Sequence, residues 1–380
     1  MFGRGYLKGG DSLAAEYIAY RFKQLTCKPY HESFFQSFSF PINTIIEAKA
    51  KTDEQNLQLG REYILNSLSA SHKGKYTLLT LPKNLLEDEA KKQWLLTQNL
   101  HKTALVFDKN TFNAIAQSNQ KDLNQKIRQA PVWVELQPQK LTASVSTLQI
   151  PQTTLEVLQN TWDTTAKNIH IQVQTQLKKH TARNVIAYIE GSLQPDSFIV
   201  FTAHYDHLGG IGKEVYFPGA NDNAAGIAML FQLADYYRQN PPPYSVLFIA
   251  FAGEEAGLIG SKYYTENPFF PLARIKLLLN LDLIGTGDEG MMVVNGAIFP
   301  KEYTQLVEIN NAKKLLPTIQ KRGTAANSDH YFFSAKGVKA FFWYTLGGIK
   351  AYHDIDDKPE TLPLTKFKEI YQLLIDFAAL

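Results

Sequence analysis

The second half of the chain alternates between short apolar runs and stretches with helical spacing. Apolar runs of strand length occur at 198–203, 244–251 and 276–283, and helical spacing is found at 224–238 and 258–265. The run at 244–251 is nearly continuous, as in a strand covered on both faces. Further strands are expected at 184–190, 291–294 and 338–344, and further helices at 301–313 and 364–379. This alternation predicts an α/β structure of three layers, with a central, mostly parallel mixed sheet flanked by helices.

The middle of the chain has a different character. Short β-like runs lie at 76–81, 104–107, 132–136 and 169–177, with helical stretches at 85–100 and 111–128 and an earlier helix at 12–26. None of the 23 glycines occurs between residues 75 and 190. Glycine concentrates where the backbone turns tightly or approaches a ligand, so we expect the functional site in the C-terminal half. The length of 380 residues fits a second, smaller α+β domain in the middle.

Composition narrows the functional class. The 39 Lys and Arg residues nearly balance the 36 Asp and Glu residues, so the net charge is only +3. Proteins that bind nucleic acid are usually strongly basic, which argues against such a partner. No apolar run approaches the ~18–20 residues of a membrane span. The single cysteine, Cys27, excludes a disulfide framework and a multi-cysteine zinc site.

Histidines and carboxylates follow the predicted strands of the second half. They are His204, Asp206, Asp222, Glu254, Glu255, Asp282 and, in a later loop, His353. Parallel sheets bind ligands at the carboxyl ends of their strands, so we expect these groups in one crevice. Clustered carboxylates cannot all stay ionised without compensating charge. The segments 204–207, 219–226, 253–255, 282–285 and 352–357 contain no Lys or Arg. A pair of divalent cations would compensate, and this ligand set favours zinc over cobalt or manganese.

The spacing of these residues suits separate roles. His204 and Asp206 share a face of the strand end, so one can bind metal while the other accepts the second imidazole N–H. Glu254 and Glu255 are adjacent and diverge, so one can ligate a metal while the other faces the substrate. Asp222 directly precedes a helix and can bridge two ions from a rigid position.

Six motifs carry a family resemblance. They are His-Tyr-Asp, Gly-Ala-Asn-Asp-Asn-Ala-Ala-Gly, Gly-Glu-Glu-Ala-Gly-Leu-Ile-Gly-Ser, Asn-Leu-Asp-Leu-Ile-Gly, Ser-Asp-His and Tyr-His-Asp-Ile-Asp-Asp-Lys-Pro-Glu, in this order. Together they resemble the co-catalytic dizinc aminopeptidases, the family of bacterial leucyl-type aminopeptidases and glutamate carboxypeptidase II. The resemblance implies a zinc peptidase catalytic domain at 1–44 and 176–380. It places an inserted domain at 45–175, which loosely resembles a protease-associated domain.

The resemblance also implies a set of zinc ligands. His204 and Asp282 would bind one Zn²⁺ ion, and Glu255 and His353 would bind the other. Asp222 would bridge the two ions. The expected cofactor is therefore a pair of zinc ions held by histidine and carboxylate side chains.

Two further residues are expected to act beside the metals. Glu254 would be the general base that takes a proton from a water between the two ions, and Asp206 would orient His204. The family also often has a cis peptide after the bridging aspartate, which predicts one between Asp222 and Asn223.

The substrate side is less defined. Tyr352 and the triplet Ser328, Asp329 and His330 are expected to border the substrate, although the triplet could instead cap a helix. Some family members place a tyrosine three residues before this triplet as a donor to the oxyanion. Here that position is Ala325, which leaves the donor unassigned.

We expect a zinc-dependent exopeptidase, an aminopeptidase that hydrolyses the N-terminal bond of peptide substrates. A glutaminyl cyclase of the same fold is an alternative, and so is a carboxypeptidase or dipeptidase of the same family. A carboxylate-binding member usually has an arginine-rich pocket, for which Arg322 is the nearest candidate. A receptor-like binding module would have lost ligands, and none is lost here. No signal peptide is visible, and because the family is commonly exported we expect an exported protein whose signal is missing from this chain.

Overall fold

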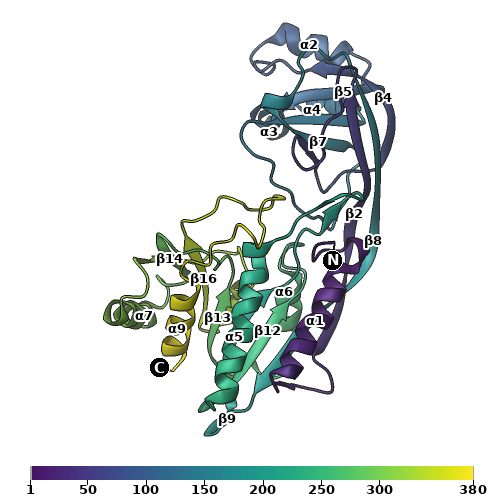
Figure 1. Cartoon of the computed structure of the whole chain (residues 1–380). Helices are drawn as coiled ribbons and strands as arrows, with labels where there is room; N and C mark the ends of the chain where they lie inside the picture. Colours follow the sequence, from purple (N-terminus) through teal and green to yellow (C-terminus); the bar gives the residue numbers. More distant parts are fainter. Residues whose placement is uncertain (1, 380) are drawn as a thin grey trace. The chain divides into compact units, whose positions relative to one another are not determined.

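The computed structural model describes residues 2–379, and its internal contacts divide the chain into two units (Figure 1). The first unit holds the residues up to Ser39, Thr181–Gly209 and the residues from Phe217 onward. The second unit holds Phe40–His180 and Gly210–Tyr216. The expected inserted domain, 45–175, lies within the second unit. That unit also takes in the short segment Gly210–Tyr216, which the sequence pattern did not assign to it.

A mixed sheet forms the centre of the first unit, with the strand order β15-β14-β16-β13-β9-β12-β8. Its strands are β8 (Asn168–Ile189), β9 (Gln194–His204), β12 (Tyr244–Phe251), β13 (Ile275–Leu281), β14 (Gly290–Val294), β15 (Ile319–Arg322) and β16 (Ala340–Leu346), and the short β1 (Lys28–Pro29) pairs with β8. Strands β16, β13, β9 and β12 run parallel to one another, whereas β14 and β8 pair antiparallel at the two ends of this group. The predicted mostly parallel mixed sheet is confirmed.

Helices cover both faces of this sheet. They are α1 (Gly10–Gln24), α5 (Ala225–Gln239), α6 (Ile259–Glu266), α7 (Pro300–Lys313), α8 (His330–Ala335) and α9 (Phe367–Ala378). On one face of β12, Phe248 stacks on Phe22 of α1 with ring centroids 5.8 Å apart. On the other face, Phe251 contacts Tyr264 of α6 and Phe333 of α8. Because successive strand residues point to opposite faces, this three-layer packing explains why β12 is apolar from Val246 to Phe251.

The second unit continues the sheet through β8 and has its own core. Its strand order is β8-β4-β5-β6-β7-β3, and β2 also pairs with β8. The elements are β2 (Phe35–Thr52), β3 (Tyr63–Leu65), β4 (His72–Thr80), α2 (Glu89–Thr97), β5 (Thr103–Asp108), α3 (Lys109–Gln117), α4 (Lys121–Ile127), β6 (Val132–Gln137), β7 (Thr153–Leu158), β10 (Gly210–Ile211) and β11 (Val215–Tyr216). Leu105 of β5 and Trp133 of β6 pack against Leu95 of α2 and Ile115 of α3. The unit contains both helices and strands as expected, but β4, β5, β6 and β7 run parallel to one another, with α2, α3 and α4 between them in the chain, as in an α/β rather than an α+β arrangement.

Two local expectations were wrong. The helix predicted at 111–128 is two helices, because the Ser118 hydroxyl donates to the Ile115 carbonyl and accepts from the Gln120 N–H, which ends α3. Strand β2 was not predicted, although its burial alternates from Gln36 to Ile42 as in a half-buried strand.

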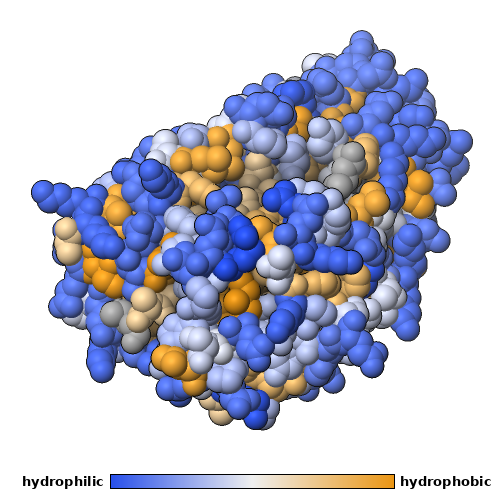
Figure 2. Space-filling model, turned by 60° about the horizontal axis from the view of Figure 1, so that its bottom comes forward, coloured by the Kyte–Doolittle hydropathy of each residue, from blue (hydrophilic) through white to orange (hydrophobic). Residues whose placement is uncertain are grey.

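The surface drawn in Figure 2 is mainly hydrophilic, and its apolar patches are interrupted by polar side chains. Exposed large apolar residues include Leu13, Tyr17 and Tyr20 on α1 and Leu177 on β8. Among residues 2–379, no helix combines the length and the apolar character that a bilayer crossing requires.

Candidate metal centre

Three neighbouring parallel strands deliver most of the candidate site residues. His204 is the last residue of β9, Glu254 and Glu255 lie in the turn after β12, and Asp282 directly follows β13. These strands lie side by side in the order β13-β9-β12 and share one direction, so their carboxyl ends meet at one edge. The edge brings the four side chains together as the general rule for parallel sheets predicts.

Asp222 lies between two histidines. Its Oδ1 is 3.2 Å from Nε2 of His204, and its Oδ2 is 3.1 Å from Nε2 of His353. The predicted cis peptide between Asp222 and Asn223 is confirmed. One carboxylate therefore presents a different oxygen to each side, which is the arrangement that a bridging ligand requires.

Each side of Asp222 has a second carboxylate. Asp282 Oδ1 lies 3.3 Å from Nε2 of His204, and Glu255 Oε2 lies 3.2 Å from Nε2 of His353. Two donors bound to the same tetrahedral zinc at 2.0–2.1 Å lie about 3.3 Å apart. The four donor–donor distances agree with this value, so the residues present fit two neighbouring cations.

His207 joins this cluster, although sequence reasoning left it undecided. Its Nδ1 lies 2.7 Å from Oε1 of Glu255 and 3.9 Å from Oδ1 of Asp222. With these two carboxylates it forms one of two groups whose ligand atoms lie within 4.8 Å of one another, the other being His204, Asp222 and Asp282. The ring is fully buried, and its Nε2 has no hydrogen-bond partner. His207 is thus a further candidate ligand or a positioning group for Glu255.

Asp206 supports the site from behind. Its carboxylate accepts hydrogen bonds from the Tyr6 hydroxyl at 2.7 Å and from the backbone N–H groups of Glu254 and Glu255 at 3.2 and 3.3 Å. Nδ1 of His204 lies 3.1 Å from the Asp206 carbonyl and 3.9 Å from its carboxylate. A carbonyl only accepts, so Nδ1 carries the proton and Nε2 is free to bind a metal. The contact that orients His204 is therefore made by the backbone of Asp206.

Arg4 and Asp357 hold the segment around Asp222, and neither was identified from the sequence. The Arg4 guanidinium donates to the carbonyls of Tyr205, Pro218, Gly219 and Asp222 at 2.8, 2.7, 2.7 and 3.1 Å. The Asp357 carboxylate accepts from the N–H groups of Asn221 and Asp222 at 2.8 and 3.0 Å. The fold thus brings a cation from the N-terminal segment to motifs that contain none at the positions considered.

The carboxylates still outnumber the arginine. Seven acidic side chains gather within the first unit near this edge, namely Asp206, Asp222, Glu254, Glu255, Asp282, Asp329 and Asp357. One guanidinium cannot balance them in a buried setting. The excess of negative charge is the electrostatic signature of a site for divalent cations.

Proton affinities shift accordingly. Burial opposes protonation of His204, but the charges of Glu254 and Asp282 outweigh it and raise the pKa of His204 well above its ordinary value. Burial and Asp222 raise the pKa of Glu255, yet hydrogen bonds from His207 and His353 outweigh them and lower it to about 2. Burial raises the pKa of Glu254 well above its ordinary range. The two adjacent glutamates are thus pushed in opposite directions, as a ligand and a base would be.

A pocket of about 210 Å³ opens onto this cluster. It is lined by His204, Asp222, Glu254, Glu255, Asp282, Leu283, Asn327, Phe342, Tyr344, Tyr352 and His353. The Tyr352 ring stacks on His353 with centroids 4.0 Å apart. At about 30 Å³ per water, the pocket holds about seven water volumes, the size of one amino-acid residue.

The triplet expected to border the substrate is placed differently. Ser328, Asp329 and His330 are fully buried and do not line the pocket. The Ser328 hydroxyl donates to Oδ2 of Asp282 at 3.0 Å. Burial of His330 lowers its pKa to about 4, so this ring is neutral. Ser328 therefore supports Asp282 from inside the fold, and Asp329 and His330 are buried beside it where α8 begins.

Comparison with known proteins adds to this picture. Residues 184–378, just over half of the chain, match the model of peptidase family M28. A probable zinc metalloprotease of Pyricularia oryzae is 36% identical over 111 residues, which are 28% of this chain and 22% of the relative. Aminopeptidase YwaD of Bacillus subtilis is 28% identical over 169 residues, which are 43% of this chain and 36% of the relative. The matched parts thus span well under two thirds of these relatives.

Solved structures share the fold. BSAP, a zinc aminopeptidase from Bacillus subtilis, matches with a TM-score of 0.70 and 16% identity, covering 99% of this chain and 90% of that one. An aminopeptidase from Aneurinibacillus sp. strain AM-1 matches with a TM-score of 0.66 and 18% identity, covering 99% and 89%. At these identities the likeness establishes the architecture.

Proposed function

This chain belongs to peptidase family M28, and on that premise we propose that it is a zinc-dependent aminopeptidase. It would hydrolyse the bond after the first residue of a peptide. One observation carries the proposal. The pocket is lined by four carboxylates and two histidines, and neither lysine nor arginine is among its lining residues. Once two cations compensate these carboxylates, the lining offers no side-chain cation to bind the C-terminal carboxylate of a peptide, and Glu254 is left as a carboxylate that is not assigned to a metal.

We propose two zinc ions, each held by one histidine and one carboxylate in addition to Asp222. His204 and Asp282 would hold one ion, and His353 and Glu255 the other, with Asp222 between them. The support is the pair of distances from the two Asp222 oxygens to the two imidazoles, 3.2 and 3.1 Å. When bound, zinc supplies a Lewis acid and lowers the pKa of a water ligand to about 7.

Glu254 would move the proton. Its Oε2 lies 4.0 Å from Nε2 of His204, and its side chain lines the pocket with 13% exposure. Burial raises its pKa, which brings a carboxyl group toward the range where it accepts a proton from the attacking water near neutral pH. The same oxygen can then return that proton to the leaving amine nitrogen, so that hydrolysis leaves the side chain unchanged.

Tyr352 is the proposed substrate contact. It is 43% exposed, and its ring covers His353 on the pocket side. Ser328, Asp329 and His330 would act indirectly, by holding Asp282 and the wall behind it. This revises the expectation that the triplet meets the substrate.

Glu254→Gln tests the proposal. With a panel of aminoacyl p-nitroanilides, kcat of the zinc-loaded variant should be about 10²–10⁴-fold lower than that of wild type, because an amide cannot accept the proton. The zinc content of the variant should be unchanged. Glu266→Gln on the exposed part of α6 is the matched control and should leave kcat unchanged. N-acetylated substrates should not be cleaved.

Three results would contradict the aminopeptidase assignment. Full activity in Glu254→Gln would remove the proposed base. Ammonia released from a peptide that begins with glutamine, without release of its first residue, would indicate a cyclase. Cleavage of N-blocked peptides from the C-terminus would indicate a carboxypeptidase.

Export stays a prediction that rests on the family resemblance. Fractionation of the native host with an antibody against this chain tests it. Detection confined to the cytoplasmic fraction would contradict it.

A further inference from the structure

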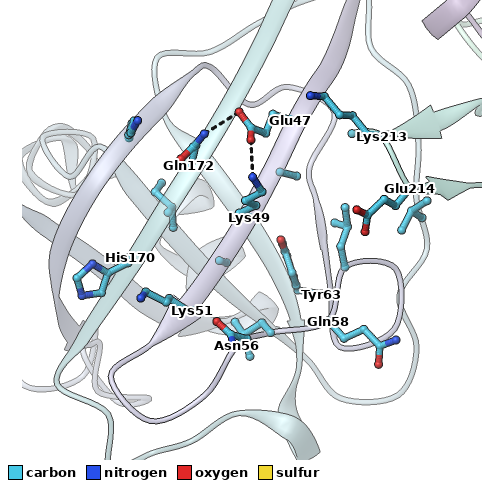
Figure 3. Close-up of a pocket in the computed structure, with 18 of the residues that line it drawn as sticks. Glu47, Lys49, Lys51, Asn56, Gln58, Tyr63, His170, Gln172, Lys213 and Glu214 are labelled. Atoms are coloured by element: carbon cyan, nitrogen blue, oxygen red, sulfur yellow. Dashed lines mark hydrogen bonds and ion pairs between the residues drawn. The ribbon is translucent and has the colours of Figure 1, made fainter.

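The second unit contains a large hollow of its own, of about 880 Å³. All of its lining residues belong to that unit, within Phe40–His180 and Gly210–Tyr216. The walls come from β2, β4, β8 and the β10–β11 hairpin (Figure 3). Its volume is within the range of about 300–1,000 Å³ typical of ligand sites.

Positive charge dominates this hollow. Five lysines line it, namely Lys49, Lys51, Lys73, Lys75 and Lys213, against the two acidic residues Glu47 and Glu214. Lys49 pairs with Glu47 at 2.8 Å, and Lys75 lies 3.9 Å from Asp53. Among residues 2–379, no ion pair within 4.0 Å involves the side chains of Lys51, Lys73 or Lys213. Three exposed ammonium groups thus border a common space without an ion pair within 4.0 Å.

The backbone spaces these charges regularly. Lys49 and Lys51 are two residues apart on β2, and Lys73 and Lys75 are two residues apart on β4. At about 3.3 Å per residue, such same-face positions lie about 6.6 Å apart. Figure 3 shows Lys213 and Glu214 entering from the hairpin, across from the β2 residues. An extended peptide with acidic residues at every second position repeats its carboxylates at the same interval.

The lining favours a peptide over other polyanions. Single-stranded nucleic acids bind on exposed aromatic platforms, but Tyr63 is only 1% exposed, and the remaining ring on the lining is His170. A single inorganic anion would occupy a small part of about 880 Å³. The buried apolar floor, with Leu57 and Ile171, suits the aliphatic parts of side chains.

We propose that this hollow binds an extended acidic peptide segment, whose carboxylates pair with the lysines of β2, β4 and the hairpin. The inference goes beyond the proposed peptidase activity and does not depend on it, because it concerns binding in the second unit. Charge pairs of this kind give specificity and weaken with salt.

Fluorescence anisotropy with the full chain tests the proposal. The probe is a fluorescein-labelled octapeptide with glutamate at alternate positions, blocked at both ends so that no exopeptidase can cleave it. A matched probe carries glutamine in place of glutamate. The acidic probe should bind about tenfold or more tightly than the neutral one, and its affinity should fall between about 50 and about 300 mM salt.

Variants locate the binding. Lys51→Glu with Lys73→Glu should weaken binding of the acidic probe about tenfold, and Lys51→Gln with Lys73→Gln should weaken it less. Lys83→Glu with Lys102→Glu makes the same charge change on exposed positions of the second unit outside the hollow, and should leave affinity within about twofold.

Any one of three results would overturn the proposal. Equal binding of the acidic and neutral probes would exclude charge recognition. Unchanged affinity in the first double variant would exclude this hollow. Competition by inorganic phosphate or by an oligothymidylate of equal charge, as effective as that by unlabelled acidic peptide, would exclude a peptide site.

Discussion

Arg4 offers a sharp test of how the metal centre is held. Its guanidinium donates four hydrogen bonds, three of them at 2.7–2.8 Å, to backbone carbonyls at and before Asp222. A hydrogen bond to a charged group contributes about 1.5–3 kcal/mol, and the bonds of one side chain are not additive. At about 1 kcal/mol for each bond, Arg4→Met should lower the free energy of unfolding by about 4 kcal/mol. That loss is a large part of the free energy of unfolding of a typical domain, which is about 5–15 kcal/mol.

Urea unfolding of the metal-free and the zinc-loaded protein measures this loss. Arg4→Lys keeps the positive charge but lacks the planar guanidinium with its several donors. Its free energy of unfolding should lie between those of wild type and Arg4→Met. Arg274→Met is the matched control, because its exposed pair with Asp196, at 3.1 Å, should be worth at most about 1 kcal/mol. Zinc should stabilise Arg4→Met less than wild type, since Asp222 loses its fixed backbone. A loss below about 1 kcal/mol in Arg4→Met would refute the view that these four bonds hold the site.

Three further predictions follow from contacts in the two units. Tyr6→Phe removes the donor to the buried Asp206 carboxylate at 2.7 Å and should cost about 1.5–3 kcal/mol in urea unfolding; no change would show that water replaces the hydroxyl. Burial lowers the pKa of His353, but its carboxylate partners raise it to about 10 in the metal-free fold, so its contribution to stability is full below about 6.5 and is lost as pH rises through about 10. Zinc needs the neutral ring, so zinc binding near pH 7.5 should release protons and tighten as pH rises; calorimetry in buffers of different ionisation enthalpy checks this, and a buffer-independent heat would contradict it. Leu105→Ala in the core of the second unit should cost about 2–5 kcal/mol, seen as a lower urea midpoint, whereas a smaller loss would show that the cavity collapses.

The strands and most helices of the first unit could be predicted because their apolar periodicity is strong and their length is typical. The candidate ligands could be predicted because they directly follow strands, and the direction of a parallel strand fixes where its end lies. Strand β2 was missed although Phe38, Phe40 and Ile42 lie on its buried face, and its Pro41 is a residue that is uncommon inside strands.

The supporting contacts could not be predicted. Arg4 binds backbone carbonyls, and every residue carries a carbonyl, so no residue type marks the acceptor. The sequence likewise could not predict which atom of Asp206 orients His204, because that atom is the backbone carbonyl oxygen and not a carboxylate oxygen. The burial of the triplet at 328–330 depends on where α8 packs, which the local pattern does not report.

The contacts of Arg4 also set the order in which the site can form. Its partners lie 201 to 218 residues later in the chain. At about 5–20 residues per second, a ribosome needs about 10–40 s to make them after Arg4 itself. The nascent N-terminal segment must therefore wait, bound elsewhere or free, until the strands and the loop before Asp222 exist. Tight metal binding by Asp222 should follow that closure, so metal content should report whether both distant parts of the chain have been joined.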